Sequence, residues 1–502
     1  MLMLKKIPLV ILPILTAVLL VLAYPKFNFG WLGWAALGPL SYYLLKVKRP
    51  AAAALGGLGC GALFYLGALY WIYPTMRAGG VGPGVSALGL GLLALTLGLE
   101  FLVISVFGFY LKKAGLKVWP YVFAAGWLAL EFGKIWLAQK AVWFPWFMLG
   151  YTQWAYGPVV QLVSVTGVYG LSAALCFTGA LAAAALAADV SWPRRALRLL
   201  PAPLLIAGIF YFGAAELKKA ETFAPEKTVK VALLQPSIDF YAKWDAAEAG
   251  NIKTRLSGLL AAAAPSDLTV WPENALPCWI DEPDCEAWLK AAAAARGGAN
   301  FVGSVSKDGG RRVSAFLLDG QGEITASYDK RQLVPFGEYV PLRALLGKFI
   351  QPVAALGEFD PGPPEQRLLD LKGVKLGAAI CYEAIFPPLF AGDARDGADL
   401  FVNITNDGWY LDTAAPHQHF VANIFRAVET RRPVVRAANN GISAVIDPWG
   451  RVLARTSLNE RTVLEAEAPL YPGQAFFPLY GHWFLWAALM AAAAFLLAVL
   501  FV

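Results

Sequence analysis

Charged side chains and histidines are scarce in this chain. Only 15% of its 502 residues are charged, where soluble domains have about 25%. Together with a hydrophobic content of 58%, this excludes an ordinary soluble protein. The net charge is +7, but the more polar part of the chain, residues 216–482, has no basic run interleaved with aromatic residues. We therefore expect no nucleic-acid partner.

The shortage of histidine also bears on cofactors. His417 and His419, two of only three histidines, could be interpreted as a metal-binding pair. However, no carboxylate or cysteine partner stands beside them at ligand spacing. The glycine-rich run at 56–61 lies within an apolar segment, where close helix packing explains it better than nucleotide binding. We therefore expect neither a metal nor a cofactor.

The five cysteines fall into two groups. Cys60 and Cys176 lie in apolar segments, whereas Cys278, Cys285 and Cys381 lie in the more polar part of the chain. In an oxidising compartment, Cys278 and Cys285, which flank a short acidic loop, could form a disulfide and leave Cys381 as the odd thiol. Three reduced cysteines fit the sequence equally well.

Long apolar runs are abundant, and the mean hydropathy is +0.53. A membrane-spanning helix needs about 20 mostly apolar residues. We predict seven spans before residue 216 and an eighth at Trp483–Val502. The seven lie at residues 7–24, 29–45, 53–73, 85–111, 118–133, 157–188 and 197–215. This pattern predicts a membrane domain at 1–215, a catalytic domain at 216–480 and a C-terminal transmembrane helix at 481–502.

Basic residues are unevenly divided among the connecting loops. If the N-terminus lies inside, the inner loops hold eleven Lys and Arg residues and the outer loops four. The inner set is Lys5, Lys6, Lys46, Lys48, Arg49, Lys112, Lys113, Lys117, Arg194, Arg195 and Arg198, and the outer set is Lys26, Arg77, Lys134 and Lys140. Because Lys and Arg accumulate in cytoplasmic loops, the domain at 216–480 is predicted to lie outside the cytoplasm. The first apolar segment is long for a signal peptide, so we expect a retained anchor.

Residues 228–468 alternate strand-like and helix-like segments. Strands are predicted at 229–235, 268–271, 300–305, 374–380 and 400–404, and helices at 246–264, 285–296 and 416–430. Val313–Leu318 and Glu323–Asp329 are predicted to form a hairpin across Asp319-Gly320, and Asn440-Gly441 is a second turn signal. This alternation is typical of a layered α/β domain.

Three polar residues stand where predicted strands end or in the loops that follow. Cys381 follows the apolar run Leu376–Ile380, Glu273 follows a short strand, and Lys330 opens a loop rich in proline and glycine. A lone cysteine is more often a small buried hydrophobe. A cysteine on a rigid strand end, however, is well placed to act as a nucleophile.

A nucleophilic thiol needs a base, a nearby positive charge or both, because it attacks as the thiolate. Glu273 would be the general base, and Lys330 would lower the thiol pKa and stabilise the oxyanion. The backbone N–H of Tyr382 would be the second oxyanion donor. Taken singly, Glu273 and Lys330 could be ordinary solvated residues.

Three sequence motifs resemble those of the apolipoprotein N-acyltransferase branch of the nitrilase superfamily: WPEN (271–274), DKRQLVPFGEYVP (329–341) and CYEAIFP (381–387). Further motifs similar to that family lie at 403–409 and 436–442, and the apolar segments also fit it. The resemblance therefore covers most of the chain. It implies a four-layer α-β-β-α sandwich beside a multi-span helical membrane domain. It also implies that Glu273, Lys330 and Cys381 form a catalytic triad.

The resemblance adds supporting residues to this site. Glu338 would be a second carboxylate, Tyr382 and Glu383 would shape the site, and Trp244 would lie on a loop near it. The chain departs from the pattern at Val313-Ser314, where many relatives have a Tyr-Asn pair after the loop arginine. The three triad positions are intact.

The resemblance also implies a ping-pong acyl transfer without cofactor or metal. A membrane phospholipid, giving its sn-1 chain, would acylate Cys381 as a thioester. The α-amino group of a diacylglyceryl-cysteine apolipoprotein would then attack the thioester. Such a multi-pass protein would lie in the bacterial cytoplasmic (inner) membrane, with its catalytic domain on the periplasmic or external face. We expect it to act as a monomer.

Two other functions remain open from the residues alone. A membrane-anchored nitrilase or amidase would use water and a soluble amide, although eight spans are excessive for anchoring. A non-enzymatic scaffold or transporter would carry a degenerate domain. The intact Glu-Lys-Cys set argues against the second, as does the near absence of mid-span charge apart from Glu100 and Glu131.

A largely apolar stretch, residues 346–359, lies between the lysine and cysteine motifs. An exposed apolar loop is unfavourable unless it contacts membrane or ligand. We expect a lid here, with Gly347 and Gly357 as hinges; packing into the core is the alternative. The residues expected to line the acyl entrance are Phe349, Ile350, Val353 and Leu356. The tryptophan-rich segment 136–154 would lie beside it at the membrane interface.

The loop charges lead to a topology prediction. Reporter fusions after Arg49, Lys117 and Arg198 should read cytoplasmic, and fusions within 230–470 should read external. A cytoplasmic reading within 230–470 would overturn both the topology and the expected function.

Overall fold

The computed structural model describes residues 8–240, 243–341 and 357–500. The chain forms two compact units. One ends at Lys219 and resumes at Tyr480, and the other spans Ala220–Leu479. The expected lid residues Phe349, Ile350, Val353 and Leu356 lie outside the described residues.

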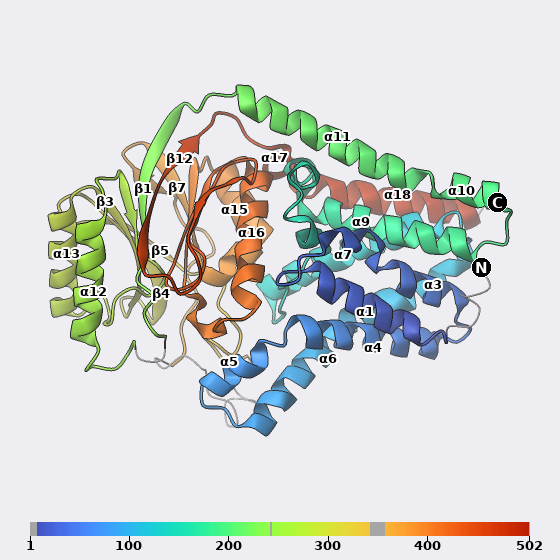
Figure 1. Ribbon diagram of the computed structural model, residues 1–502, viewed down its shortest axis with the longest axis horizontal. Helices are drawn as coiled ribbons and strands as arrows, with labels where there is room; N and C mark the ends of the chain where they lie inside the picture. The colour runs from blue at the N-terminus through green and yellow to red at the C-terminus, as the bar shows by residue number, and fades with distance from the viewer. Residues whose placement is uncertain (1–7, 241–242, 342–356, 501–502) are drawn as a thin grey trace. The chain divides into compact units, whose positions relative to one another are not determined.

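The first unit is helical (Figure 1). Its elements are α1 (Ile11–Ala23), η2 (Gly30–Leu32), α2 (Gly33–Ala36), α3 (Gly38–Lys46), α4 (Pro50–Ala68), α5 (Ile72–Ala78), α6 (Pro83–Leu111), η3 (Lys112–Ala114), α7 (Trp119–Lys140), η4 (Leu149–Gln153), α8 (Gly157–Val160), α9 (Val163–Ala187), α10 (Trp192–Leu199), α11 (Pro201–Thr222) and α18 (Trp483–Leu500). Within the described residues, five helices are long and apolar enough to cross a membrane. They span Pro50–Ala68, Pro83–Ala114, Trp119–Lys140, Val163–Ala187 and Trp192–Thr222, and Ile11–Ala23 and Trp483–Ala494 are shorter apolar helices.

Some helices differ from the segments expected from hydropathy. The segment 29–45 is divided among η2, α2 and α3, the longest of which has nine residues. Helix α9 is kinked at Gly167, whose φ of 65° lies in the left-handed region that favours glycine. Helix α11 continues past residue 215 to Thr222. The number of membrane crossings therefore stays a prediction.

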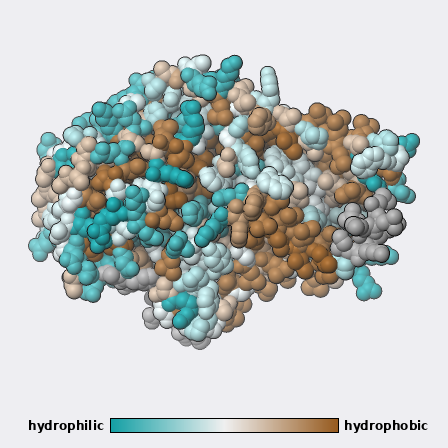
Figure 2. Space-filling model, in the orientation of Figure 1, coloured by the Kyte–Doolittle hydropathy of each residue, from teal (hydrophilic) through white to brown (hydrophobic). Residues whose placement is uncertain are grey.

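Apolar side chains cover outer faces of the helical unit, as Figure 2 shows for α1, α4 and α6. Examples are Leu55, which is 69% exposed, and Leu88, which is 61% exposed. Soluble monomers rarely expose contiguous apolar patches larger than a few hundred Å². These faces suit a lipid environment, and the helices satisfy their own backbone polar groups as a bilayer requires.

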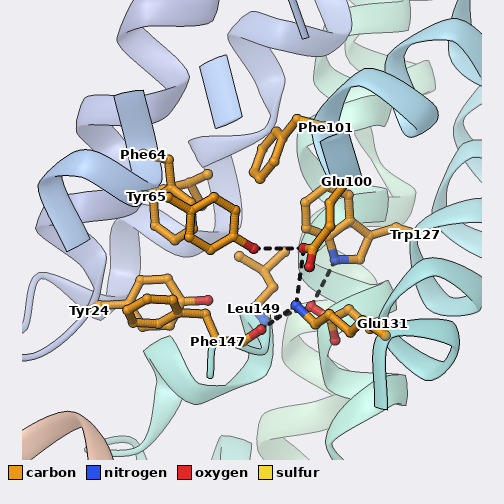
Figure 3. A pocket seen from close by; sticks show the side chains of 11 residues that line it. Tyr24, Phe64, Tyr65, Glu100, Phe101, Trp127, Glu131, Phe147 and Leu149 are labelled. Atoms are coloured by element: carbon orange, nitrogen blue, oxygen red, sulfur yellow. Dashed lines mark hydrogen bonds and ion pairs between the residues drawn. The ribbon is translucent and has the colours of Figure 1, made fainter. Parts of the chain in front are cut away.

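A buried ion pair lies inside this unit (Figure 3). Lys134 Nζ is 3.5 Å from Glu100 Oε2 and donates to the carbonyl oxygen of Phe147. Tyr65 donates its hydroxyl to the same Glu100 oxygen at 2.6 Å. The placement of Lys134 in an outer loop is therefore wrong, because α7 continues past residue 133 and buries this side chain. Without Lys134, the bias toward basic inner loops is stronger.

Glu131 extends this polar cluster by one helical turn. Its Oε1 accepts from the Leu149 N–H at 2.7 Å and from Trp127 Nε1 at 3.0 Å. The cluster lines a cavity of about 10 Å³, roughly the space that one water needs. Buried charges are tolerated only when paired and hydrogen-bonded. The cluster therefore ties α4, α6 and α7 to the segment that follows α7.

The second unit contains two six-stranded mixed sheets. The first has the order β12-β1-β2-β3-β4-β5, formed by Thr462–Leu470, Lys227–Gln235, Leu268–Val270, Ala299–Ser306, Arg312–Leu318 and Ile324–Asp329. The second has the order β11-β10-β9-β8-β7-β6, formed by Val452–Arg455, Ala444–Ile446, Val434–Ala438, Leu400–Thr405, Val374–Ile380 and Leu369–Leu371. β1, β2 and β3 run parallel to one another, as do β7, β8 and β9.

Helices cover the outer face of each sheet (Figure 1). α12 (Ala249–Ala262) and α13 (Pro283–Arg296) pack Leu256 and Leu289 on the first sheet. α15 (Pro387–Arg395) places the Phe390 ring 4.7 Å from that of Phe401 in the second sheet, and α16 (Ala415–Thr430) lies beside it. A further apolar core, with side chains from both sheets, lies between them. The predicted four-layer α-β-β-α sandwich is confirmed.

Cys278 and Cys285 form a disulfide at the start of α13. Their Cα atoms lie 6.1 Å apart, within the usual range. Cys60, Cys176 and Cys381 are free thiols. The sequence left open whether Cys278 and Cys285 are paired or reduced, and in the structure they are paired.

The polar cluster predicts a stability effect inside the helical unit. Lys134→Met removes the cation facing Glu100, and removing one partner of a buried pair costs about 3–5 kcal/mol. We expect a lower unfolding midpoint in detergent micelles. The control is Lys140→Met, since Lys140 is exposed at the end of the same helix. Equal midpoints for the two variants would contradict a stabilising role.

Candidate active site

The chain turns sharply where β7 delivers Cys381. Cys381 has a φ of 53°, in the left-handed region that costs a non-glycine residue about 1–2 kcal/mol. Such a conformation persists only where the surroundings hold it. The preceding Ile380 N–H donates to Glu383 Oε2 at 2.7 Å, and the Cys381 carbonyl oxygen lies 2.9 Å from His419 Nε2. The buried thiol is thus presented at a constrained strand end.

Lys330, which follows β5, lies between two carboxylates. Its Nζ is 3.0 Å from Glu273 Oε1 and 2.6 Å from Glu338 Oε1. The second oxygen of each carboxylate accepts a backbone N–H at 2.8 Å, from Asn406 for Glu273 and from Val334 for Glu338. All three charged side chains are buried. The structure thus brings Glu273, Lys330 and Glu338 into direct contact.

The electrostatics of this group follow from its burial and composition. Burial alone would lower the pKa of Lys330, but Glu273 and Glu338 outweigh it and hold that pKa well above its ordinary value. Burial raises the pKa of Glu338, and Lys330 opposes that shift. Lys330 is therefore an ammonium group, and Glu338 is a second acidic side chain in direct contact with it.

The thiol of Cys381 interacts electrostatically with the same group. Burial raises its pKa well above the ordinary value, Glu273 raises it further, and Lys330 opposes the rise. At rest Cys381 is therefore a neutral thiol, and nucleophilic attack requires a base to take its proton. Glu273 is close enough for its charge to shift the pKa of this thiol.

Glu383 connects the lysine loop to the turn at Cys381. Its fully buried carboxylate accepts from the Tyr328 hydroxyl at 2.9 Å and from the Arg331 and Gln332 N–H groups at 2.6 and 3.1 Å. It also accepts from Ile380, the residue before Cys381. One carboxylate thus links the loop that carries Lys330 to the turn that carries Cys381.

The other predicted site residues have less direct contacts. Trp244 is partly buried against the core between the sheets. Tyr382 is buried, with its ring 5.2 Å from that of Phe386. Ser314, at the position that departs from the family pattern, donates its hydroxyl to Asp329 Oδ1 at 2.6 Å. Its hydrogen bond holds the residue immediately before Lys330.

Lys243 is a buried residue that sequence reasoning missed. Its side chain is 2% exposed, and its Nζ has no hydrogen-bond partner among the described residues. Burial lowers its pKa to about 7, and the charge of Glu273 opposes that shift. The Nζ lies 5.0 Å from the centre of the Trp244 ring. The resemblance singled out only Trp244 in the run 243–245, and nothing in the sequence marked Lys243, because a loop lysine is ordinarily exposed to solvent.

Sequence reasoning also missed a charged cluster that reaches the backbone of Cys381. Arg436 Nη2 donates to Asp407 Oδ2 at 2.8 Å, and Asp407 Oδ1 lies 2.8 Å from His419 Nδ1. These side chains are fully buried. His419, considered above as half of a metal pair with His417, instead contacts a carboxylate and the carbonyl of Cys381.

Comparison with known proteins agrees with this architecture. A family model described as apolipoprotein N-acyltransferase N-terminal domain matches residues 16–181, and one described as carbon-nitrogen hydrolase matches residues 230–472. An apolipoprotein N-acyltransferase of Geobacter metallireducens is 37% identical over 495 residues, which cover 96% of this chain and 93% of that protein. The enzyme of the same name from Azotobacter vinelandii is 33% identical, covering 89% and 86% respectively.

Among solved structures, an amidase from Nesterenkonia sp. AN1 is 22% identical and has a TM-score of 0.38. The match covers 49% of this chain and 93% of the amidase.

The two-sheet sandwich and its family match define the second unit as a carbon–nitrogen hydrolase, or nitrilase-class, domain. The chain as a whole belongs to the apolipoprotein N-acyltransferase family. With its long apolar helices, it is a bacterial membrane protein.

The raised pKa of Cys381 predicts its reactivity. Below the pKa the thiolate fraction grows tenfold per pH unit, so alkylation of Cys381 by iodoacetamide should keep accelerating above pH ~8.5, where an ordinary thiol levels off. A Cys60→Ala, Cys176→Ala background leaves a single free thiol. Lys330→Met removes the stabilising cation and should slow alkylation at every pH. A plateau below pH ~8.5 would contradict a neutral resting thiol.

Proposed function

We propose that this protein transfers a fatty acyl chain from a membrane phospholipid, through a thioester on Cys381, to the N-terminal amine of a diacylglyceryl-cysteine apolipoprotein. The convergence of a buried thiol, a lysine and two carboxylates at strand and loop ends carries this proposal. The names of the relatives supply the reaction class, a lipoprotein acceptor and, by implication, a lipid donor.

The first half-reaction acylates the thiol. Glu273 takes the Sγ proton as Sγ attacks the ester carbonyl carbon of the lipid, so a C–S bond forms and the carbonyl oxygen becomes an oxyanion. Lys330 Nζ and the Tyr382 N–H stabilise that oxyanion. The ester C–O bond then breaks, and Glu273 returns its proton to the departing lysophospholipid oxygen. Thioester and lysophospholipid are the products.

The second half-reaction transfers the chain to nitrogen. The neutral α-amine of the acceptor attacks the thioester carbonyl, and Glu273 accepts the proton that the nitrogen loses. The C–S bond breaks and the proton passes to Sγ, which restores the resting thiol. Cys381, Glu273 and Lys330 are each at most 3% exposed. A site that excludes water in this way favours attack by the amine over hydrolysis.

Glu338 explains how one lysine serves both half-reactions. Glu273 is neutral whenever it holds the proton, and it then no longer stabilises the Lys330 ammonium. Glu338, 2.6 Å from Lys330 Nζ, remains a partner at that moment. Lys330 therefore stays charged when the oxyanion forms, which is when its charge is needed.

The proposed setting is the bacterial inner membrane, with the catalytic unit on the external face. Two independent features support this orientation. Basic residues accumulate in the loops expected inside, and the catalytic unit contains the disulfide Cys278–Cys285. Structural disulfides are rare in the reducing cytosol.

Intact-mass analysis tests the thioester. After incubation with phospholipid vesicles, the wild-type protein and the control Cys176→Ala should gain the mass of one acyl chain, which an amine acceptor then removes as an amide. Cys381→Ala should gain nothing. An adduct on Cys381→Ala would refute the assignment, and release of the chain only as free fatty acid would favour the hydrolase alternative.

The base and the cation should affect the rate of thioester formation. Glu273→Gln preserves the shape of the side chain but cannot take the thiol proton, and Lys330→Met removes an oxyanion-stabilising charge. Losing one such donor slows catalysis about a hundred- to a thousandfold, and we expect losses of at least that size in single-turnover acylation. Wild-type rates in either variant would contradict its role.

A further inference from the structure

A histidine contacts the carbonyl oxygen of the peptide bond between Cys381 and Tyr382. His419 lies in α16, is fully buried, and places Nε2 2.9 Å from the carbonyl oxygen of Cys381. Its Nδ1 lies 2.8 Å from Asp407 Oδ1. The other oxygen of Asp407 accepts from Arg436 Nη2 at 2.8 Å. A continuous buried chain thus runs from Arg436 to the backbone of Cys381.

These contacts define the protonation state of the ring. Carboxylate and carbonyl oxygens face the two ring nitrogens and only accept, so both bonds form only if both nitrogens carry protons. Arg436 Nη2 is also 3.4 Å from Nδ1, but this contact is much longer than the one with Asp407. Burial opposes ionisation of Asp407, yet Arg436 and His419 outweigh it and hold the pKa of that carboxyl below its ordinary value. The cluster therefore holds two cations and one anion.

The hydrogen bond to Cys381 has a consequence on the other side of the same peptide. The carbonyl oxygen of Cys381 and the N–H of Tyr382 belong to one planar trans unit and point in opposite directions. Fixing the oxygen on His419 therefore fixes the direction of the N–H. A charged donor on the oxygen also polarises the peptide and strengthens the N–H as a donor. Cys381 requires such a constraint, because its φ of 53° is unfavourable for a side chain.

The segment that contains Asp407 also contacts Glu273, the proposed base. The Asn406 N–H donates to Glu273 Oε2 at 2.8 Å, one residue before Asp407. Asp407 is held further by Thr405, whose hydroxyl is 3.3 Å from Asp407 Oδ1. The end of β8 therefore sets the carboxylate of the base and, through His419, the peptide plane at the nucleophile.

We propose that the His419 imidazolium is a positioning residue that holds and polarises the Cys381–Tyr382 peptide, so that its N–H binds the oxyanion. This inference rests on the proposed function in taking Cys381 as the nucleophile and the Tyr382 N–H as an oxyanion donor. His419 touches no substrate and acts through the backbone.

The test compares two reactions of the same thiol. Acylation of Cys381 by a p-nitrophenyl ester passes through an oxyanion, whereas alkylation by iodoacetamide does not. His419→Leu should slow acylation about a hundred- to a thousandfold, mainly in kcat, and leave alkylation largely unchanged. His419→Gln, which retains a neutral N–H donor, should recover part of the loss. The control His417→Gln changes the partly buried neighbour on the same helix and should behave as wild type.

The outcomes separate the possible roles. A parallel fall of acylation, alkylation and unfolding midpoint in His419→Leu would make the histidine merely structural and overturn the proposal, as would unchanged acylation. The activated ester keeps the test independent of the lipid donor. If the wild-type protein reacts with the ester but not with phospholipid vesicles, the proposed donor fails while the role of His419 is still measured.

The charge on the ring can be observed directly. The chain has only three histidines, so ¹⁵N-histidine labelling gives few ring signals. Comparison with His417→Gln and His482→Gln identifies the signals of those two histidines, and the remaining two ring-nitrogen signals then belong to His419. At neutral pH both of its ring nitrogens should show the chemical shifts of protonated imidazolium. One protonated and one bare nitrogen would overturn the charged hydrogen-bond donor.

Discussion

The site depends on keeping one ammonium group charged away from water. Burying a lone lysine costs several kcal/mol, and partners offset that cost only with good geometry and satisfied hydrogen bonds. Lys330 has two carboxylates within 3.0 Å, and each carboxylate has a backbone donor of its own. This requirement draws together the segment after β2, the loop after β5 and the end of β8. The convergence of these segments forms the proposed active site.

The second constraint is rigidity at Cys381, the proposed nucleophile. Cys381 occupies a backbone conformation that is unfavourable for a side chain, and two buried polar groups hold it from different directions. Glu383 binds the preceding N–H and the lysine loop together, and His419 binds the following carbonyl. In the proposed mechanism, neither group needs to touch the substrate. Preorganisation of this kind removes reorganisation from the reaction step, which is where electrostatic catalysis gains most.

Burial has opposite effects on the charged groups of this chain, according to their partners. Lys330, with two anions, remains an ammonium group, whereas Lys243, without a hydrogen-bond partner among the described residues, has a pKa lowered to about 7. In the helical unit, Lys134 is stabilised by Glu100 and a backbone carbonyl. Composition cannot distinguish these cases, since each is a lysine in an apolar setting.

The sequence by itself determined the class of the chain, the layered α/β pattern and the three polar strand-end or loop residues, because hydropathy and periodicity are local and Glu273, Lys330 and Cys381 stand in long motifs. It could not determine which residues meet. The cluster around Lys134 and the chain from Arg436 through Asp407 to His419 join segments distant in sequence, whereas the Cys278–Cys285 disulfide and the burial of Lys243 depend on how loops pack. Side-chain distance and burial decide charge and hydrogen bonding, and only tertiary packing sets these quantities.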